Sequence, residues 1–367
     1  MTGSRIRLAP LALAAFLLAG SLQAAGPRDS LKKGTPELQS ISALAFGPEG
    51  ILFIGDARAA AVVAVDTQDR TAATSTDRPK VEALDEKIAA LLGVEAGQLA
   101  IDALAVNPIS GNAYLGVMRG KGAEGTPVLL RVERSGKVGE VSLKDVAFAR
   151  TMLPNPAKIN PGNRRQQPGD VITHMAFVKG QLFVACLSNE EFASQFRAIP
   201  FPFKESAKGT GIEIFHGSHD AVETRSPIRT FVACEIKGET NLLAAYTCTP
   251  LVQIPVADLK PGEKIRGKTI AELGNGNRPL DMIVYHKGGK EYILLANNRR
   301  GVMKIPTEGI DKAEAITTRV RGTAGLKYDT LKNLQGTEHL DAFDKDHALV
   351  LIRTADKKLN LETVELP

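Results

Sequence analysis

Residues 41–67 read ISALAFGPEGILFIGDARAAAVVAVDT and contain three apolar runs separated by two short turn-forming segments. The first of these, residues 47–50, is Gly-Pro-Glu-Gly, where proline fixes φ and glycine can adopt a positive φ. The β-branched and small apolar residues on either side favour strands. The stretch therefore predicts an antiparallel meander, which is most of one propeller blade.

The same opening pattern recurs along the chain, each time followed by a turn and a second apolar run. The copies begin at Ile41, Ile101, Ile172, Leu242, Leu280 and His339. Repetition of one supersecondary unit indicates a radially repeated architecture. We therefore predict an all-β chain that folds as a β-propeller with six blades, seven being the alternative count.

Two segments depart from the repeat. Residues 79–97 carry leucine and isoleucine at helical spacing before a glycine, which predicts one short helical insertion. Residues 26–40 are polar and contain proline and glycine, which indicates an extended lead-in. Because the last repeat supplies only three strands, we expect this lead-in to complete the last blade and remove an exposed edge. Residues 41–367 then form a single propeller domain.

The first 25 residues have the layout of a secretory signal peptide. Arg5 and Arg7 precede an apolar run at residues 8–18, and small residues follow. The run is shorter than the roughly 20 residues that a spanning helix needs, so we expect an exported chain, periplasmic or secreted, with no membrane span. Removal of the signal peptide lowers the net charge from +5 to +3. The chain also contains no tryptophan. Without a basic block, this composition argues against nucleic-acid binding.

The chain contains three cysteines, Cys186, Cys234 and Cys248. In an oxidising compartment their spacing predicts a disulfide between Cys234 and Cys248, with Cys186 left single. The alternative is that all three are reduced, buried thiols. The sequence has no Cys-x-x-Cys-His motif, which covalent haem attachment needs.

Two segments are predicted to be loops. Residues 152–170 contain four prolines and an arginine pair among few apolar residues, which indicates a surface loop. Residues 188–211 are unusual for a loop because they contain Phe192, Phe196, Phe201 and Phe203. We expect this aromatic segment to lie outside the sheets, either as a lid over one propeller face or as a docking patch.

Aligning the six repeat starts predicts which side chains line the central channel, because the innermost strand of each blade faces it. Four ionisable side chains converge in this alignment: Asp102, His174, Asp281 and His339. The fourth repeat contributes only Leu242 and its neighbour. The ionisable group could bind a divalent cation or perform acid–base chemistry. The alternative is a water-filled channel lined by ordinary polar groups.

A second candidate site lies on two adjacent loops of one blade, residues 272–281 and 296–301. Their amides and guanidinium groups suit a carboxylate, a phosphate or a sugar-like ligand. The side chains are Asn277, Arg278, Asn297, Asn298 and Arg299. The alternative is a pair of solvated turns in which asparagine tolerates positive φ.

The units AFGPEGILFIGD followed by VVAVD, and AVNPISGNAYLGV followed by LLRVE, resemble the NHL, SMP-30 (gluconolactonase) and YVTN-type propellers. That resemblance implies a propeller whose role is one of three: metal-dependent lactonase, quinoprotein dehydrogenase or binding platform. The lactonase-type members use a Glu, Asn and Asp metal set. Asp281 and Asn277 match it in residue type, and no glutamate near the start of the first blade matches the third ligand.

From these observations we expect a soluble, monomeric propeller that binds a small ligand or a partner protein through its channel mouth and top-face loops. The alternative is a metal-dependent enzyme, either a lactonase-like hydrolase or a quinoprotein-like oxidoreductase, with its site at the channel mouth. The common catalytic templates GxSxG and HExxH do not occur in the sequence.

Overall fold

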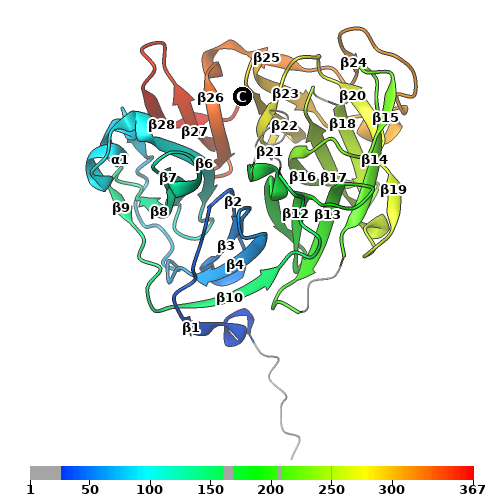
Figure 1. Cartoon of the computed structure of the whole chain (residues 1–367). Coiled ribbons are helices and arrows are strands. Elements are labelled where there is room, and N and C mark those ends of the chain that lie inside the picture. Colours follow the sequence, from blue (N-terminus) through cyan, green and yellow to red (C-terminus); the bar gives the residue numbers. More distant parts are fainter. Residues whose placement is uncertain (1–25, 160–167, 205–207, 249) are drawn as a thin grey trace, which may run out of the picture.

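The computed structural model describes residues 26–159, 168–204, 208–248 and 250–367. Six mainly antiparallel sheets are arranged radially around a central channel, so the predicted six-bladed β-propeller is confirmed (Figure 1). No helix in the described ranges is long and apolar enough to cross a membrane. Residues 1–25, the predicted signal peptide, lie outside the described residues.

Each blade has one strand at the channel, and its other strands follow towards the outside. From the channel outwards, blade one contains β2 (Ala43–Phe46), β3 (Ile51–Asp56), β4 (Ala61–Asp66), β10 (Val146–Met152) and β1 (Lys32–Gly34). Blade two contains β6 (Leu99–Val106), β7 (Ala113–Arg119), β8 (Thr126–Val132) and β9 (Val138–Glu140). Blade three contains β11 (His174–Val178), β12 (Gln181–Leu187), β13 (Ser194–Pro200), β14 (Thr210–His216) and β15 (Ala221–Glu223), with β19 (Lys264–Arg266) parallel to β14.

The remaining blades are built in the same way. Blade four contains β16 (Ile228–Ile236), β17 (Glu239–Tyr246), β18 (Pro250–Pro255), β20 (Lys268–Glu272) and β24 (Ala324–Gly325). Blade five contains β21 (Pro279–Lys287), β22 (Lys290–Asn297), β23 (Gly301–Pro306) and β25 (Asp329–Leu331). Blade six contains β26 (Thr337–Ala342), β27 (His347–Arg353), β28 (Leu359–Glu365) and β5 (Lys80–Val81).

Short 3-10 helices connect several of these strands. Those in the described residues are η1 (Pro27–Ser30), η2 (Pro48–Gly50), η3 (Ala96–Gln98), η4 (Gly122–Glu124), η5 (Pro168–Val171), η6 (Val256–Asp258), η7 (Ile310–Lys312) and η8 (Lys332–Leu334). The predicted Gly-Pro-Glu-Gly turn is η2, which joins β2 to β3. Gly47 is required there because a Cβ would lie 2.4 Å from the ring of Phe53.

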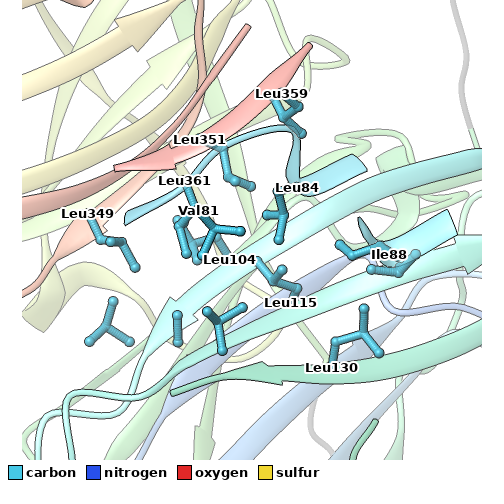
Figure 2. Close-up of a cluster of buried hydrophobic side chains, with 14 of the residues drawn as sticks. Val81, Leu84, Ile88, Leu104, Leu115, Leu130, Leu349, Leu351, Leu359 and Leu361 are labelled. Carbon is cyan, nitrogen blue, oxygen red and sulfur yellow. The ribbon is translucent and has the colours of Figure 1, made fainter. Parts of the chain in front are cut away.

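The predicted helical insertion is confirmed as α1 (Leu84–Leu92), which ends at Gly93 with φ 67°. Leu84, Ile88 and Leu92 are buried in a cluster shared by blades two and six. Figure 2 shows Leu84 and Ile88 beside leucines of both blades. Burying each such side chain stabilises the fold by roughly 1.5–3 kcal/mol. The helix therefore seals the gap between two blades.

Ring closure differs from the prediction. The fourth strand of blade six is β5, which pairs Val81 with Leu361. The lead-in, residues 26–40, instead supplies β1, which pairs Lys32 with Phe148 of β10 at the outer edge of blade one (Figure 1). The prediction that the lead-in completes the last blade is wrong, because β10 returns to blade one after blade two and offers its own free edge.

Blade four begins one strand earlier than the repeat alignment predicts. Its innermost strand is β16, whereas Leu242 and Leu243 lie fully buried on β17, the second strand. Both strands are apolar runs of similar length, so periodicity alone does not distinguish them. The channel positions that we predicted for these two leucines belong to the β16 segment around Phe231.

The aromatic segment, residues 188–211, is not a loop outside the sheets. It contains β13, the third strand of blade three, and Phe196 on this strand is buried edge-on against Phe231, with ring centroids 4.9 Å apart. Phe201 packs against Phe53 at 5.0 Å, and Phe203 joins the same cluster. Phe196 on β13 is therefore a core residue, and Phe201 and Phe203 pack partly buried against the core, so both the lid and the docking patch are wrong.

Residues 152–170 are only partly a surface loop. Met152 is exposed at the end of β10, but Leu153 and Asp170 are buried. Residues 160–167 of this segment, which include the arginine pair, lie outside the described residues. The buried Asp170 makes this segment part of the channel mouth.

The predicted disulfide between Cys234 and Cys248 is wrong. Cys234 pairs with Asn241 near one end of β16, and Tyr246 pairs with Ile228 at the other end. Five residues of strand separate Asn241 from Tyr246, or about 17 Å at 3.3 Å per residue. A disulfide requires Cα atoms within about 7 Å. Cys186 and Cys234 are instead buried thiols, and no disulfide joins the three cysteines.

Candidate functional site at the channel mouth

A cavity of about 880 Å³ occupies the end of the channel where the innermost strands begin. A smaller cavity of about 380 Å³ lies further along the channel and is lined mainly by apolar side chains. His174 and Asp281 line both cavities, so these two residues mark the boundary between them. The polar side chains are gathered in the larger cavity, which we call the mouth cavity.

The four ionisable residues from the repeat alignment all line the mouth cavity. Asp102 lies on β6, His174 on β11, Asp281 on β21 and His339 on β26, so they come from four different blades. In the described part of the chain, the groups of three or more side chains close enough to share a metal ion include none in this cavity.

Irregular strand pairing places several of these side chains. The register of the innermost strand shifts at Asp102 in β6, at Arg229 in β16, and between Pro279 and Met282 in β21. A bulge bends its strand and re-aims a side chain, and bulges are frequent next to functional sites. Each shift coincides with a charged residue that lines the mouth cavity.

His339 is held by oxygen atoms on both sides of its ring. Nδ1 lies 2.8 Å from Asp281 Oδ2, and Nε2 lies 3.2 Å from the Ile101 carbonyl oxygen. A neutral imidazole carries one N–H and can donate to only one acceptor, whereas the cation donates to both. Burial lowers the pKa of His339, but the Asp281 charge and the two hydrogen bonds raise it by more, so its pKa lies above the ordinary value.

This arrangement makes His339 a clamp between three blades. It joins blade six to Asp281 of blade five and to the Ile101 carbonyl of blade two, and the Leu340 N–H also donates to Asp281 at 3.2 Å. A metal ligand or a general base needs an unprotonated ring nitrogen. His339 would lose one of its two contacts in either role, so the geometry disfavours both.

His174 and Asp102 differ from His339 because each can still form a hydrogen bond with a ligand. Burial lowers the pKa of His174, which the Asp281 charge opposes, and this favours the neutral ring. Its Nδ1 has no hydrogen-bond partner in the described residues. Burial raises the pKa of Asp102, while the charges of His339 and Arg58 oppose the shift. Perturbed titratable groups in a cavity are typical of functional sites.

The five loop residues predicted as a second site divide into two groups. Arg278, Asn297 and Asn298 line the mouth cavity, whereas Asn277 and Arg299 are not among its lining residues. The Arg278 N–H donates to Asn298 Oδ1 at 2.8 Å, and the Arg299 N–H donates to Asn277 Oδ1 at 3.2 Å. These two amides therefore hold the loops together, and the side chain that faces the cavity with a charge is Arg278.

Arg278 belongs to a charge cluster that the sequence did not reveal. Arg229 Nη1 lies 2.5 Å from Asp170 Oδ1, with the two side chains only 9% and 2% exposed. Burial and the neighbouring Arg229 lower the pKa of Arg278, and Asp170 partly opposes them. Two guanidinium groups thus face one carboxylate, which leaves an excess positive charge on this side of the mouth. Aligning β16 correctly would have placed Arg229 in the channel.

The two arginines of the opposite wall have partners of their own, and Arg58 also lies close enough to Asp102 for its charge to lower the pKa of that carboxyl. Arg58 Nη2 donates to the Gly122 carbonyl oxygen at 2.6 Å. Arg353 donates to both carboxylate oxygens of Glu338, at 2.5 and 2.9 Å. Arg229 and Arg353 are salt-bridged to carboxylates, whereas no salt bridge of Arg278 is found among the described residues.

Comparisons with known proteins show likeness of overall shape alone. No protein-family model matches the chain, and no curated protein does. Among solved structures, a proposed oxidoreductase (glucose dehydrogenase) of Thermus thermophilus is 15% identical, with 91% of this chain and 99% of that chain covered and a TM-score of 0.32. The extracellular domains 1–2 of Drosophila Semaphorin 1b are 11% identical, with 92% and 87% covered and a TM-score of 0.36.

A Drosophila structure of Plexin A in complex with Semaphorin 1b is 10% identical, with 92% and 87% covered and a TM-score of 0.38. Identities and TM-scores this low carry no argument about activity or partners. The resemblance to NHL, SMP-30 and YVTN-type propellers is supported at the level of the propeller fold, and no single family among them is identified.

Proposed function

We propose that the chain is an exported propeller that binds a small organic anion in the mouth cavity. The observation that carries this proposal is the pairing of Arg278 and Arg229 around the single carboxylate of Asp170. A carboxylate or phosphate placed against Arg278 balances the extra charge and accepts two parallel hydrogen bonds from its guanidinium fork. The proposal that the chain is exported, to the periplasm or outside the cell, is based on the signal-peptide pattern of residues 1–25.

The rest of the cavity suits hydroxyl groups. Asp102 can accept a hydrogen bond from a ligand hydroxyl, and the unpartnered Nδ1 of His174 can accept or donate one, depending on its tautomer. A volume of about 880 Å³ lies within the usual range of small-ligand pockets, roughly 300–1,000 Å³. The ligand class is therefore a small hydroxylated carboxylate or phosphate.

The metal-dependent enzyme is the less favoured proposal. The metal site predicted from the sequence includes His339, and both ring nitrogens of this histidine are hydrogen-bonded to oxygen. Small-molecule binding leaves that clamp intact. A protein partner is also less favoured, because the polar side chains converge inside a cavity.

Calorimetric titration of the purified mature protein with a panel of hydroxy acids and sugar phosphates tests the proposal. We expect one class of ligand to bind saturably. Arg278→Ala should weaken binding of that ligand about 10- to 100-fold, because a hydrogen bond to a charged group contributes about 1.5–3 kcal/mol. Arg299→Ala is the matched control: this arginine lies in the adjacent loop but does not line the cavity. No binding by any anion, or equal affinity for wild type and Arg278→Ala, would overturn it.

A further inference from the structure

A second cluster of chemically capable side chains lies outside the mouth cavity, between blades three and four. His216 is the last residue of β14, His219 lies in the turn that follows, and Cys248 lies in the turn between β17 and β18. One ligand atom from each comes within 4.8 Å of the others. The three residues are brought together by the packing of two blades, since Cys248 is distant from the histidines in sequence.

The buried histidine of this cluster has an unsatisfied nitrogen. His216 is only 1% exposed, and neither its Nδ1 nor its Nε2 has a hydrogen-bond partner within the described residues. A buried polar atom without a partner costs free energy, so an orphaned ring nitrogen calls for an explanation. A metal ion that accepts the lone pair of a His216 ring nitrogen supplies one.

A carboxylate already faces the Nδ1 atom of each histidine. Glu223 Oε1 lies 2.6 Å from His219 Nδ1, and Glu223 Oε2 lies 3.1 Å from His216 Nδ1. Where Glu223 accepts from His219 Nδ1–H, it fixes the tautomer in which Nε2 of His219 carries the lone pair. Metal-binding histidines are usually oriented in this way by a carboxylate.

The charge around the cluster also suits a cation. Glu272 is fully buried nearby, where its Oε1 accepts the Gly217 N–H at 2.6 Å. Its Oε2 has no hydrogen-bond partner among the residues that the structure describes. Together with Glu223 and Cys248, this carboxyl group places oxygen and sulfur atoms that can carry negative charge around the two imidazole rings. A divalent ion compensates that charge.

We propose that His216, His219 and Cys248 form a binding site for a zinc- or copper-class transition-metal ion. Imidazole and thiolate are ligands for these borderline-soft metals, whereas calcium and magnesium prefer oxygen. Metal–ligand bonds of about 2.0–2.3 Å place tetrahedral ligand atoms about 3.3–3.8 Å apart. Since the present separations do not exceed 4.8 Å, the ligand atoms need to approach one another by about 1.5 Å at most.

The site is open on one side. The His219 side chain is 47% exposed and Cys248 is partly exposed, so water can reach a fourth coordination position. Three protein ligands with one open position are typical of sites that exchange a ligand, whereas purely structural zinc sites have four protein ligands.

The test uses tag-free mature protein that has been reduced and stripped with a chelator. Equilibrium dialysis with metal analysis measures stoichiometry and affinity for Zn²⁺, Cu²⁺, Co²⁺ and Ca²⁺. We expect one equivalent of Zn²⁺ or Cu²⁺ and no Ca²⁺ at the same concentration, and competition between Zn²⁺ and Cu²⁺ decides between the two metals. Bound Co²⁺ should show the thiolate charge-transfer absorption.

Two variants and two controls assign the ligands. Cys248→Ser should remove the charge-transfer absorption, and His219→Ala should weaken binding at least tenfold. His219 is exposed, so its removal leaves the core intact. His286→Ala is its control, because His286 is also exposed and also lies near a glutamate, with Nε2 3.3 Å from Glu291. Cys234→Ala is the thiol control.

Either of two results would overturn the proposal. One is wild-type protein that takes up no Zn²⁺, Cu²⁺ or Co²⁺ after reduction. The other is Cys248→Ser and His219→Ala protein that binds metal as tightly as wild type while circular dichroism shows an unchanged fold. Metal binding and anion binding are measured in separate titrations with different ligands, so the failure of one proposal is distinguishable from the failure of the other.

Discussion

Replacing His339 by glutamine tests whether this residue is a cationic clamp. The substitution removes the positive partner of Asp281, with side chains 16% and 19% exposed for Asp281 and His339. Breaking a buried ion pair by removing one partner costs about 3–5 kcal/mol, and partial exposure places this pair near the lower end, about 3 kcal/mol. For a chain of this size we expect the melting temperature at pH 5.5 to fall by about 5 °C.

The pH dependence carries the stronger test. The folded-state pKa of His339 lies above its unfolded value, so its contribution is complete below about pH 6.5 and is lost as pH rises through the folded pKa. Urea unfolding of wild type and His339→Gln should therefore differ most at pH 5.5 and least at pH 9. Groups common to both proteins cancel in the difference. A difference that stays constant or grows with pH would refute the cationic clamp and restore His339 as a candidate ligand or base.

Two further predictions concern stability. Burial raises the pKa of Asp341 to about 7, above the unfolded value, so its contribution to the free energy of unfolding is complete below about pH 4 and is lost as pH rises through 7. Asp341→Asn keeps an acceptor for the Val106 N–H, and in urea titrations it should raise stability at pH 8 and leave it unchanged at pH 4. Leu84→Ala should destabilise the fold by about 2–5 kcal/mol because it opens a cavity between α1 and blade two, whereas Leu91→Ala on the exposed face should be close to neutral in the same assay.

The propeller could be predicted from sequence because one local pattern recurs. The turn at residues 47–50 and the paired apolar runs are short-range signals, and their repetition specifies a radial fold. The helix at residues 84–92 could also be predicted, since its apolar residues follow helical spacing. Strand β5 could not be predicted, because a strand of two residues is too short to show the alternating apolar pattern of a β-strand. Its place in blade six depends on long-range pairing with β28.

The channel residues show where sequence reasoning succeeds and where it stops. Asp102, His174, Asp281 and His339 line the mouth cavity because the repeat alignment was correct for their blades. Arg229 was missed because β16 and β17 are both apolar runs, and the alignment took the second for the first. An alignment that is wrong by one strand assigns the second strand of the blade to the channel. This single error therefore left every true channel residue of blade four out of the prediction.

The protonation of His339 and the cluster around His216 lie beyond any alignment, because both depend on atoms from different blades. His339 is a clamp only because the Ile101 carbonyl of blade two faces Nε2. Cys248 reaches the histidines only because blades three and four pack together, and its N–H donates to the Asn277 carbonyl oxygen at 2.9 Å. Asn277 precedes Arg278, so a metal that orders the Cys248 turn also restrains the residue on which anion binding depends. The two proposed sites should therefore be coupled through this one backbone contact, with metal raising anion affinity.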